Sequence, residues 1–159
     1  GTTVCRNVYP CSTPPHEPLK NYVKHVMGVP GDTLVMREKT LFVNVTRDNA
    51  VWRVPMQPDG SVSKVGAFLR LSGGVGPDGL AMDTDGNLAV AHLGLGAVWL
   101  FSAAGEPLLR IDSPAGELIT NVAYGGEDGR TLFMTESETG SILSCRMPVA
   151  GRPMFSHSA

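Results

Sequence analysis

The sequence has little of what several classes of protein require. Its 159 residues contain no run of about 18 apolar residues, so we expect neither a membrane span nor a membrane anchor. The net charge of -2 lacks the basic excess of nucleic-acid-binding domains, and we expect no nucleic-acid partner. The cysteines, Cys5, Cys11 and Cys145, show no metal-binding spacing, and a Cys5–Cys11 disulfide stays an open alternative. We expect a soluble protein, with cytoplasm or periplasm undecided.

Sustained helical periodicity is missing as well, whereas turn-forming residues are plentiful. The chain has 19 Gly and 12 Pro, against only 6% aromatic residues. Hydrophobic residues at 42% and charged residues at 18% fit a globular domain rather than a disordered chain. This composition predicts many short strands joined by tight turns.

A repeat is the strongest signal inside the chain. Three segments, beginning at Leu41, Leu88 and Leu132, each consist of an apolar strand, a polar or glycine-containing turn and a second apolar strand. They read LFVNVTRDNAVWRV, LAVAHLGLGAVWLF and LFMTESETGSILSC. A hairpin repeat of about 45 residues is typical of β-propeller blades.

The residues between these segments predict further strands. GPDGLAMDTDGN and TNVAYGGEDGRT each precede a copy, and each combines a strand of small and apolar residues with an Asp-Gly turn. Residues 65–71 and 105–111 supply outer strands at equivalent places. We therefore predict an all-β fold, a partial β-propeller of about three blades, over residues 41–159.

The pattern breaks before the first copy. CSTPPHEPLKNY is a proline-rich connector, and VPGDTLVMREKT stands where an inner strand and its Asp-Gly turn are expected. This predicts a boundary near Thr40, with residues 1–40 as an irregular or β segment foreign to the repeat. Leu34, Val35 and Met36 in that segment are suited to act as the inner strand of the first blade.

The repeat region resembles a family of metal-dependent lactonases. Its segments NAVWRVPMQPDGSV, GPDGLAMDTDGNLAVAHLGLGAVWLF and TNVAYGGEDGRTLFMTESETGSI lie within residues 41–157. They are similar to the C-terminal half of the gluconolactonase, or senescence marker protein (regucalcin), family. The resemblance implies a six-bladed propeller with one divalent cation in its central channel. It also implies hydrolysis of a small-molecule partner, a sugar lactone or similar ester.

The same resemblance implies roles for three residues. Asp78, in the PDG motif, corresponds to a metal ligand and possible base, although Pro-Asp-Gly is also a common turn signal. Asn121 takes the matching position in the next blade, and His92 falls near the channel mouth, so both are candidates for substrate binding. Oxygen ligands suit Ca²⁺, with Mg²⁺, Mn²⁺ or Zn²⁺ as alternatives. Such a cation polarises an ester carbonyl and activates water.

Two further ligands of the family have no counterpart here. The repeat offset places the family's asparagine ligand at Gly31, which has no side chain, and the glutamate of the first blade is absent. The resemblance therefore implies an incomplete cation site and impaired activity.

A second resemblance covers the N-terminal quarter. NYVKHVMGVPGDTLVMREKTLFVN, within residues 1–44, is similar to the central motif of type I signal peptidases. It implies that Lys24 corresponds to the general base of a serine–lysine peptidase. The family's serine segment and membrane anchor are absent. The sequence LFVN, at residues 41–44, is compatible with both families. We infer a chimera joined near Leu41 to Asn44.

Three functions stay open on these grounds. The first is a fragment or chimera of a divalent-metal-dependent lactone hydrolase. The second is a non-catalytic propeller fragment that packs against neighbours, with two copies forming a homodimer that completes a six-bladed ring. The third is a signal peptidase-like endopeptidase fragment without its nucleophile.

Smaller signals have structural interpretations. DTDG at residues 83–86 predicts a hairpin turn rather than a calcium loop. Glu136 and Glu138 form a carboxylate pair, for which a solvated turn is favoured over acid–base chemistry. Trp52 and Trp99 occupy equivalent repeat positions, which indicates core packing.

Overall fold

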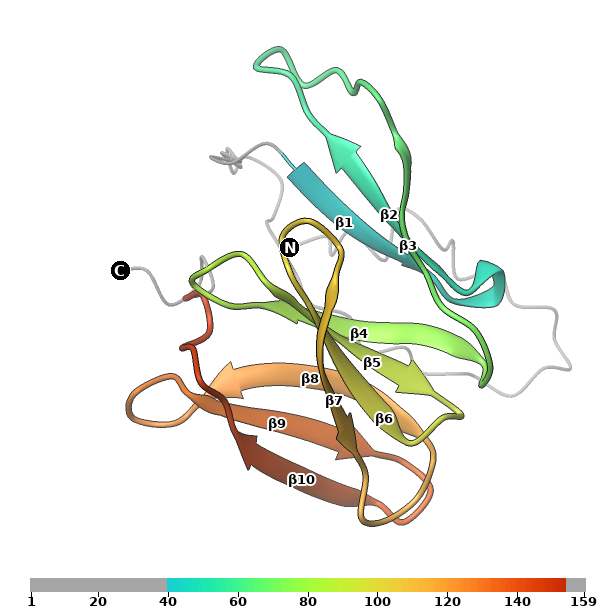
Figure 1. The fold of residues 1–159 in the computed structure, drawn as a ribbon, viewed down its shortest axis with the longest axis vertical. Helices are drawn as coiled ribbons and strands as arrows, with labels where there is room; N and C mark the ends of the chain where they lie inside the picture. The colour runs from blue at the N-terminus through green and yellow to red at the C-terminus, as the bar shows by residue number, and fades with distance from the viewer. Residues whose placement is uncertain (1–39, 154–159) are drawn as a thin grey trace, which may run out of the picture. The chain divides into compact units, whose positions relative to one another are not determined.

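The computed structural model describes residues 40–153, and over these residues the chain forms three antiparallel sheets (Figure 1). The first sheet has the order β1-β2-β3, the middle sheet β4-β5-β6-β7 and the third β10-β9-β8. The described residues contain no α-helix; η1 (Thr46–Asp48) is a single 3-10 turn. The strands are β1 (Thr40–Val45), β2 (Ala50–Pro55), β3 (Gly66–Arg70), β4 (Gly76–Met82), β5 (Leu88–Leu93), β6 (Ala97–Phe101), β7 (Pro107–Asp112), β8 (Ile119–Gly125), β9 (Thr131–Glu136) and β10 (Ser141–Arg146).

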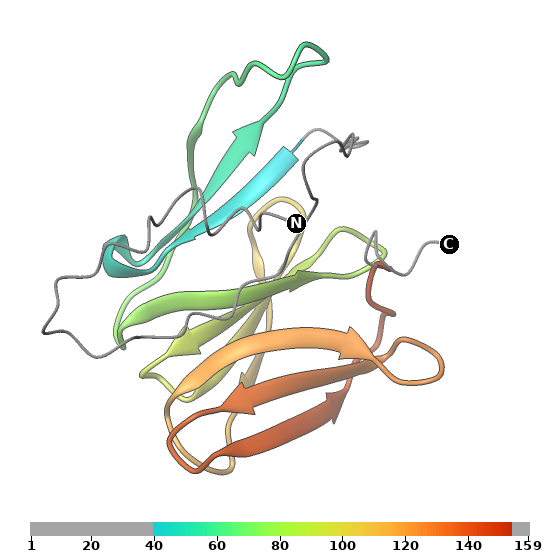
Figure 2. The same cartoon turned by 180° about the vertical axis from the view of Figure 1, so that it is seen from behind.

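This arrangement confirms the predicted all-β partial propeller of about three blades. The three repeat copies form the hairpins β1–β2, β5–β6 and β9–β10, and the segments before the second and third copies form β4 and β8. The two predicted outer strands are β3 and β7. Within the described range the sheets do not close into a ring (Figure 2).

The core lies in two layers, one on each face of the middle sheet. β5 is buried along its length because successive side chains point to opposite faces. Leu88 and Val90 belong to one cluster, and Ala89 and Ala91 to the other. The first cluster contains Val51, Leu69, Leu88, Val90 and Phe101. The second contains Ala89, Ala91, Val98, Leu100, Ile119, Val122, Leu132, Met134 and Met147.

The two tryptophans at equivalent repeat positions differ in burial. Trp99 packs against the first cluster, as expected. The expectation of core packing is wrong for Trp52, which is 36% exposed. Its neighbour Val51 enters the cluster, so Trp52 belongs to the other face of β2.

The turn after β4 is closed by one buried carboxylate. Asp83 accepts hydrogen bonds from the backbone N–H of Asp85 at 3.0 Å and of Asn87 at 2.8 Å. It also accepts one from the Asn87 side-chain amide at 2.8 Å. The DTDG sequence therefore forms a hairpin turn, as predicted.

The segment that follows β10 returns to the middle sheet. The Met147 N–H donates to the Arg130 carbonyl at 2.8 Å, and the Gly151 N–H donates to the Gly129 carbonyl at 2.9 Å. Gly151 also forms an isolated β-bridge with Asp83. Residues 147–152 thus join the third sheet to the middle sheet, a connection that the repeat pattern did not predict.

Residues 1–39 lie outside the described residues. The predictions made for Lys24, for Gly31 and for the cysteines of the N-terminal segment concern this range. None of the helical structure in residues 40–153 has the length and hydropathy of a membrane span.

Candidate functional site

β4 passes close to both neighbouring sheets at two glycines. A Cβ atom on Gly76 would lie 2.0 Å from the Thr46 carbonyl oxygen, in the turn after β1. A Cβ atom on Gly79 would lie 2.1 Å from Oδ1 and 2.5 Å from Cα of Asn121, on β8. Because neither glycine has a side chain, β4 can approach β8 and the end of β1 at backbone distance.

Asp78 lies between these two contacts and is exposed. Its backbone carbonyl accepts a hydrogen bond from the side-chain amide of Asn44, on β1. The other amide atom, Asn44 Oδ1, is buried and has no hydrogen-bond partner. The first sheet therefore fixes the backbone at Asp78 and leaves one amide oxygen of Asn44 without a partner.

The structure brings Asp78 and Asn121 to adjoining positions. Asn121 is exposed on β8 and lies against Gly79, the residue after Asp78. Its Oδ1 accepts the N–H of Val122 at 2.9 Å, which holds the side chain beside its own strand. Three strands from three different sheets thus contribute Asn44, Asp78 and Asn121 to one region of the molecule.

His92 lies on the neighbouring strand but turns toward other groups. It pairs with Pro77 in the β4–β5 ladder and is 1% exposed. Its Nε2 is 2.9 Å from the Gly73 carbonyl, and its Nδ1 accepts the indole N–H of Trp99 at 3.3 Å. Both ring nitrogens thus have protein partners, which fits a packing histidine; its substrate role stays a prediction.

The side chains around Asp78 offer some of the oxygen ligands that a hard cation prefers. Asp78 offers a carboxylate and Asn44 an amide oxygen, the ligand types preferred by Ca²⁺ and Mg²⁺. Over residues 40–153, however, no group of three or more His, Cys, Asp or Glu side chains is placed to hold a metal. A set of three such side chains around a cation at Asp78 would therefore include at least one from outside this range.

Glu136 was expected in a solvated turn, and that expectation is wrong. The side chain is 1% exposed. It accepts the N–H groups of Glu138 at 2.7 Å and of Thr139 at 2.9 Å, together with the Thr139 hydroxyl. These hydrogen bonds, with the hydroxyl contributing most, hold the pKa of Glu136 below its ordinary value. The carboxylate closes the β9–β10 turn; a threonine three residues after the glutamate was the sequence signal for this contact.

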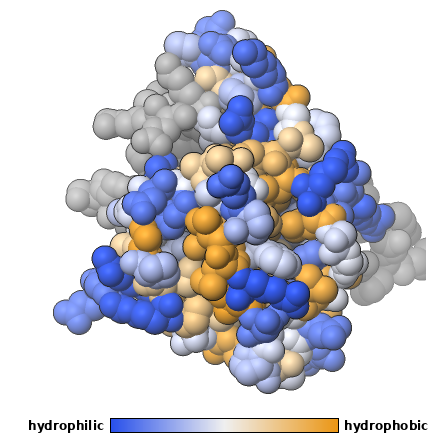
Figure 3. Space-filling model, in the orientation of Figure 1, coloured by the Kyte–Doolittle hydropathy of each residue, from blue (hydrophilic) through white to orange (hydrophobic). Residues whose placement is uncertain are grey.

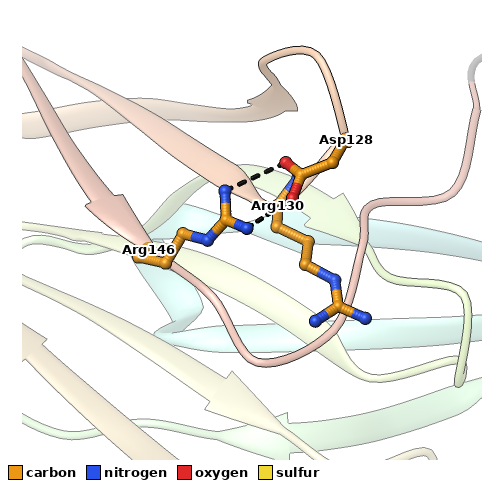
Figure 4. A network of polar contacts seen from close by, with 3 residues as sticks. All are labelled: Asp128, Arg130 and Arg146. Carbon is orange, nitrogen blue, oxygen red and sulfur yellow. Dashed lines mark hydrogen bonds and ion pairs between the residues drawn. The ribbon is translucent and has the colours of Figure 1, made fainter.

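The remaining polar networks of the third sheet are structural too. Glu138 accepts the Glu117 N–H at 2.8 Å. Figure 4 shows Arg146 reaching both carboxylate oxygens of Asp128, one of them at 3.0 Å. The Arg146 guanidinium and the Arg130 N–H hold the pKa of Asp128 below its ordinary value. These carboxylates bind protein donors within their own sheet, whereas Asn44, Asp78 and Asn121 converge from three sheets, so the Asp78 region is the candidate site.

A protein-family model described as SMP-30/Gluconolactonase/LRE-like region matches residues 20–138, about three quarters of the chain. The chain belongs to this family. The match includes all of residues 21–44, so the signal peptidase-like interpretation of that segment receives no support from it.

Individual members agree with the family assignment. The chain is 29% identical over 130 residues to Lactonase drp35 of Staphylococcus haemolyticus, covering 77% of this chain and 37% of that protein. A crystal structure of a calcium-binding protein, regucalcin, from Agrobacterium tumefaciens superposes with a TM-score of 0.62 at 26% identity, covering 72% of this chain and 44% of the other. A luciferin-regenerating enzyme, at 21% identity and a TM-score of 0.62, shares the fold, with 72% and 43% covered. The chain thus spans less than half the length of these relatives.

Proposed function

We propose that this chain supplies the Asp78-bearing part of a divalent-cation-dependent lactonase acting on a sugar lactone or related small ester. The observation that carries the proposal is the convergence of Asn44, Asp78 and Asn121 from three sheets of a gluconolactonase-family fold. Because the described residues contain no group of three His, Cys, Asp or Glu side chains placed to hold a metal, we expect reduced activity from this chain alone.

Two features of the region support a cation. The ligand atoms available are all hard oxygens, and one of them, Asn44 Oδ1, is buried without a partner. A buried amide oxygen without a partner costs about 1–3 kcal/mol, which a bound cation would offset. We expect Ca²⁺ at this position, with Mg²⁺, Mn²⁺ or Zn²⁺ as alternatives.

Each residue then has a defined task. Asp78 holds the cation and accepts a proton from the attacking water, while the Asn44 amide fixes the backbone that carries Asp78. The Asn121 NH₂ group donates to a substrate oxygen, since its Oδ1 already binds the Val122 N–H. When bound, the cation polarises the ester carbonyl and lowers the pKa of water.

A pH-stat assay with glucono-δ-lactone tests the proposal. Turnover is expected with an added divalent cation and not with a chelator. Asp78→Asn keeps the side-chain volume and should lower turnover by at least about 100-fold, the usual contribution of a general base. Asp85→Asn, at an exposed turn, is the matched control. Equal, cation-independent turnover in all three proteins would contradict the proposal.

A non-catalytic propeller module is the second candidate, favoured because the described residues hold no group of three His, Cys, Asp or Glu side chains placed for a metal. It predicts no turnover and no cation binding. For the signal peptidase-like interpretation of residues 1–44, the sequence around Lys24 is the sole support. A chimeric origin stays a proposal, and peptidase activity is not part of it.

A further inference from the structure

A cavity lies away from Asp78, between the first and middle sheets. Its volume is about 270 Å³, just below the roughly 300–1,000 Å³ typical of sites for drug-sized ligands. The lining comes from β2, from β3 with the residues before it, and from the β6–β7 turn. The residues are Arg53, Lys64, Gly66, Ala67, Phe68, Ala103 and Ala104.

The charge of this cavity is entirely positive. Arg53 and Lys64 line it, and no acidic side chain does. The ion pairs of the described residues use other cations, Arg70 with Asp48, Arg110 with Asp112 and Arg146 with Asp128. Arg53 and Lys64 take part in none of these pairs, in a chain whose net charge is -2.

The backbone places Lys64 at the cavity in an uncommon conformation. Lys64 has φ of 52°, one of two positive values for non-glycine residues in the described range. Lys64 lies at the end of the β2–β3 connection, which the Met56–Val62 bridge extends as a hairpin beyond β2. The β6–β7 turn on the other side of the cavity is short. Figure 3 shows hydrophilic side chains gathered at the end of the molecule where this hairpin lies. Strained backbone of this kind concentrates at functional sites.

The cavity is open beside Arg53, and its lining apart from Arg53 and Lys64 is apolar. Gly66 is paired directly with Arg53, and a Cβ atom on Gly66 would meet nothing within 4 Å. Phe68 contributes an aromatic ring, which packs against Phe42 with ring centroids 5.1 Å apart. A ligand that fits has one oxyanion for the two cations and a short apolar part for Phe68 and the alanine methyl groups.

We propose that this cavity binds a small organic oxyanion, a carboxylate or a phosphate monoester with a short apolar part. Arg53 and Lys64 hold the anionic group, and Phe68 contacts the apolar part. The proposal is independent of the cation chemistry at Asp78, since no residue is shared between the two sites.

Isothermal titration calorimetry with the full chain tests it, using phenyl phosphate and benzoate as the probes. Saturable binding of at least one is expected; which of the two binds more tightly distinguishes phosphate from carboxylate recognition. Inorganic phosphate should bind at least about fivefold more weakly than phenyl phosphate, because a buried phenyl ring contributes roughly 25 cal/mol per Å².

Three variants address the mechanism. Arg53→Gln and Lys64→Gln should each weaken binding by about tenfold, as expected for loss of a charged hydrogen bond. Gly66→Ile should abolish binding with both charges intact, because its side chain enters the open space. Arg130→Gln, the matched control, changes the net charge equally but lies outside the cavity lining and should bind as the parent does.

Melting temperatures confirm that each variant is folded. Equal weakening in Arg130→Gln would overturn the proposal, since it would show attraction by net charge alone. Unchanged affinity in Arg53→Gln, Lys64→Gln and Gly66→Ile would overturn it as well. Equal affinity for inorganic phosphate and phenyl phosphate would overturn the role of Phe68 and reduce the site to an adventitious ion.

Discussion

Gly79 sets how closely β4 and β8 approach, because the space of its missing side chain is filled by Asn121. A Cβ atom on Gly79 would lie 2.5 Å from the Asn121 Cα, which is backbone and cannot turn away. Gly79→Ala should therefore lower the free energy of unfolding by roughly 1–3 kcal/mol, the usual cost of overpacking. Urea denaturation measures this.

Gly66→Ala is the control for that substitution. Gly66 is also a strand glycine, but a Cβ atom there meets open space. We expect a change of at most about 1 kcal/mol, in the stabilising direction, because alanine restricts the unfolded chain. Equal destabilisation by both substitutions would show that the β4–β8 contact is not as close as described.

Glu136 gives a pH-dependent prediction. Its ordinary pKa is 4.5 and its pKa in the folded chain is lower, chiefly through the Thr139 hydroxyl. The stability that it contributes is therefore complete above pH 4.5 and is lost as the pH falls through the lower folded pKa. Glu136→Gln should have a lower urea midpoint than the parent at pH 7, and this gap should shrink on acidification toward pH 3.

The exposed Glu127, in the β8–β9 turn, supplies the control. Glu127→Gln should follow the parent across the same pH range. A gap between parent and Glu136→Gln that stays constant from pH 7 to pH 3 would contradict the assignment of the turn hydrogen bonds to the ionised Glu136 carboxylate.

At the scale of elements, the segment after β10 ties two blades together through Met147. Met147 is 2% exposed and packs in the cluster that contains Ile119 and Leu132. Met147→Ala should cost roughly 2–5 kcal/mol, as for other large-to-small core changes. Met56→Ala, at a half-buried hairpin position, should cost less. Equal urea midpoints for the two variants would show that this segment contributes little to stability.

The hairpins were predictable from sequence, whereas this connection was not. Alternating apolar residues and Asp-Gly turns are local signals, and they identified β4, β5, β8 and β9. The return of residues 147–152 depends on backbone hydrogen bonds to Gly129 and Met82, between residues far apart in the chain. The burial of Glu136 was not predicted for a related reason. Glutamate side chains are usually exposed, and Glu136 is buried because it closes the β9–β10 turn.

For the whole molecule, the two end sheets leave apolar side chains exposed. Leu41, Val43 and Trp52 on the first sheet are 45%, 38% and 36% exposed, and Phe133 and Ile142 on the third are 40% and 74% exposed. Propeller blades bury such faces against further blades. The predicted homodimer would do this with a second copy, and light scattering after size exclusion tests it. We expect a dimer that Trp52→Glu dissociates; a parent chain that is monomeric at all concentrations would contradict it.

The candidate residues were predicted from the family resemblance. It assigns Asp78 as the metal ligand, and the matching position of the next blade is Asn121, whereas Pro-Asp-Gly by itself is a common turn signal. Asn44 could not be found in this way, because its role depends on a hydrogen bond across sheets to a residue 34 positions away. His92 was selected because the resemblance places it near the channel mouth, and this does not show that its ring nitrogens lie at hydrogen-bonding distance from Gly73 and Trp99.

The most direct test of the account is a metal titration followed by the melting temperature. Ca²⁺, Mg²⁺, Mn²⁺ and Zn²⁺ are added in turn to the parent chain, to Asp78→Asn and to Asp85→Asn. At 100 times its Kd a bound cation stabilises by about 2.7 kcal/mol, which raises the Tm by roughly 5–10 °C in a chain of this size. The account predicts a saturable rise in the parent and in Asp85→Asn that is absent in Asp78→Asn. No rise with any cation, or the same rise in all three proteins, would contradict a cation site at Asp78.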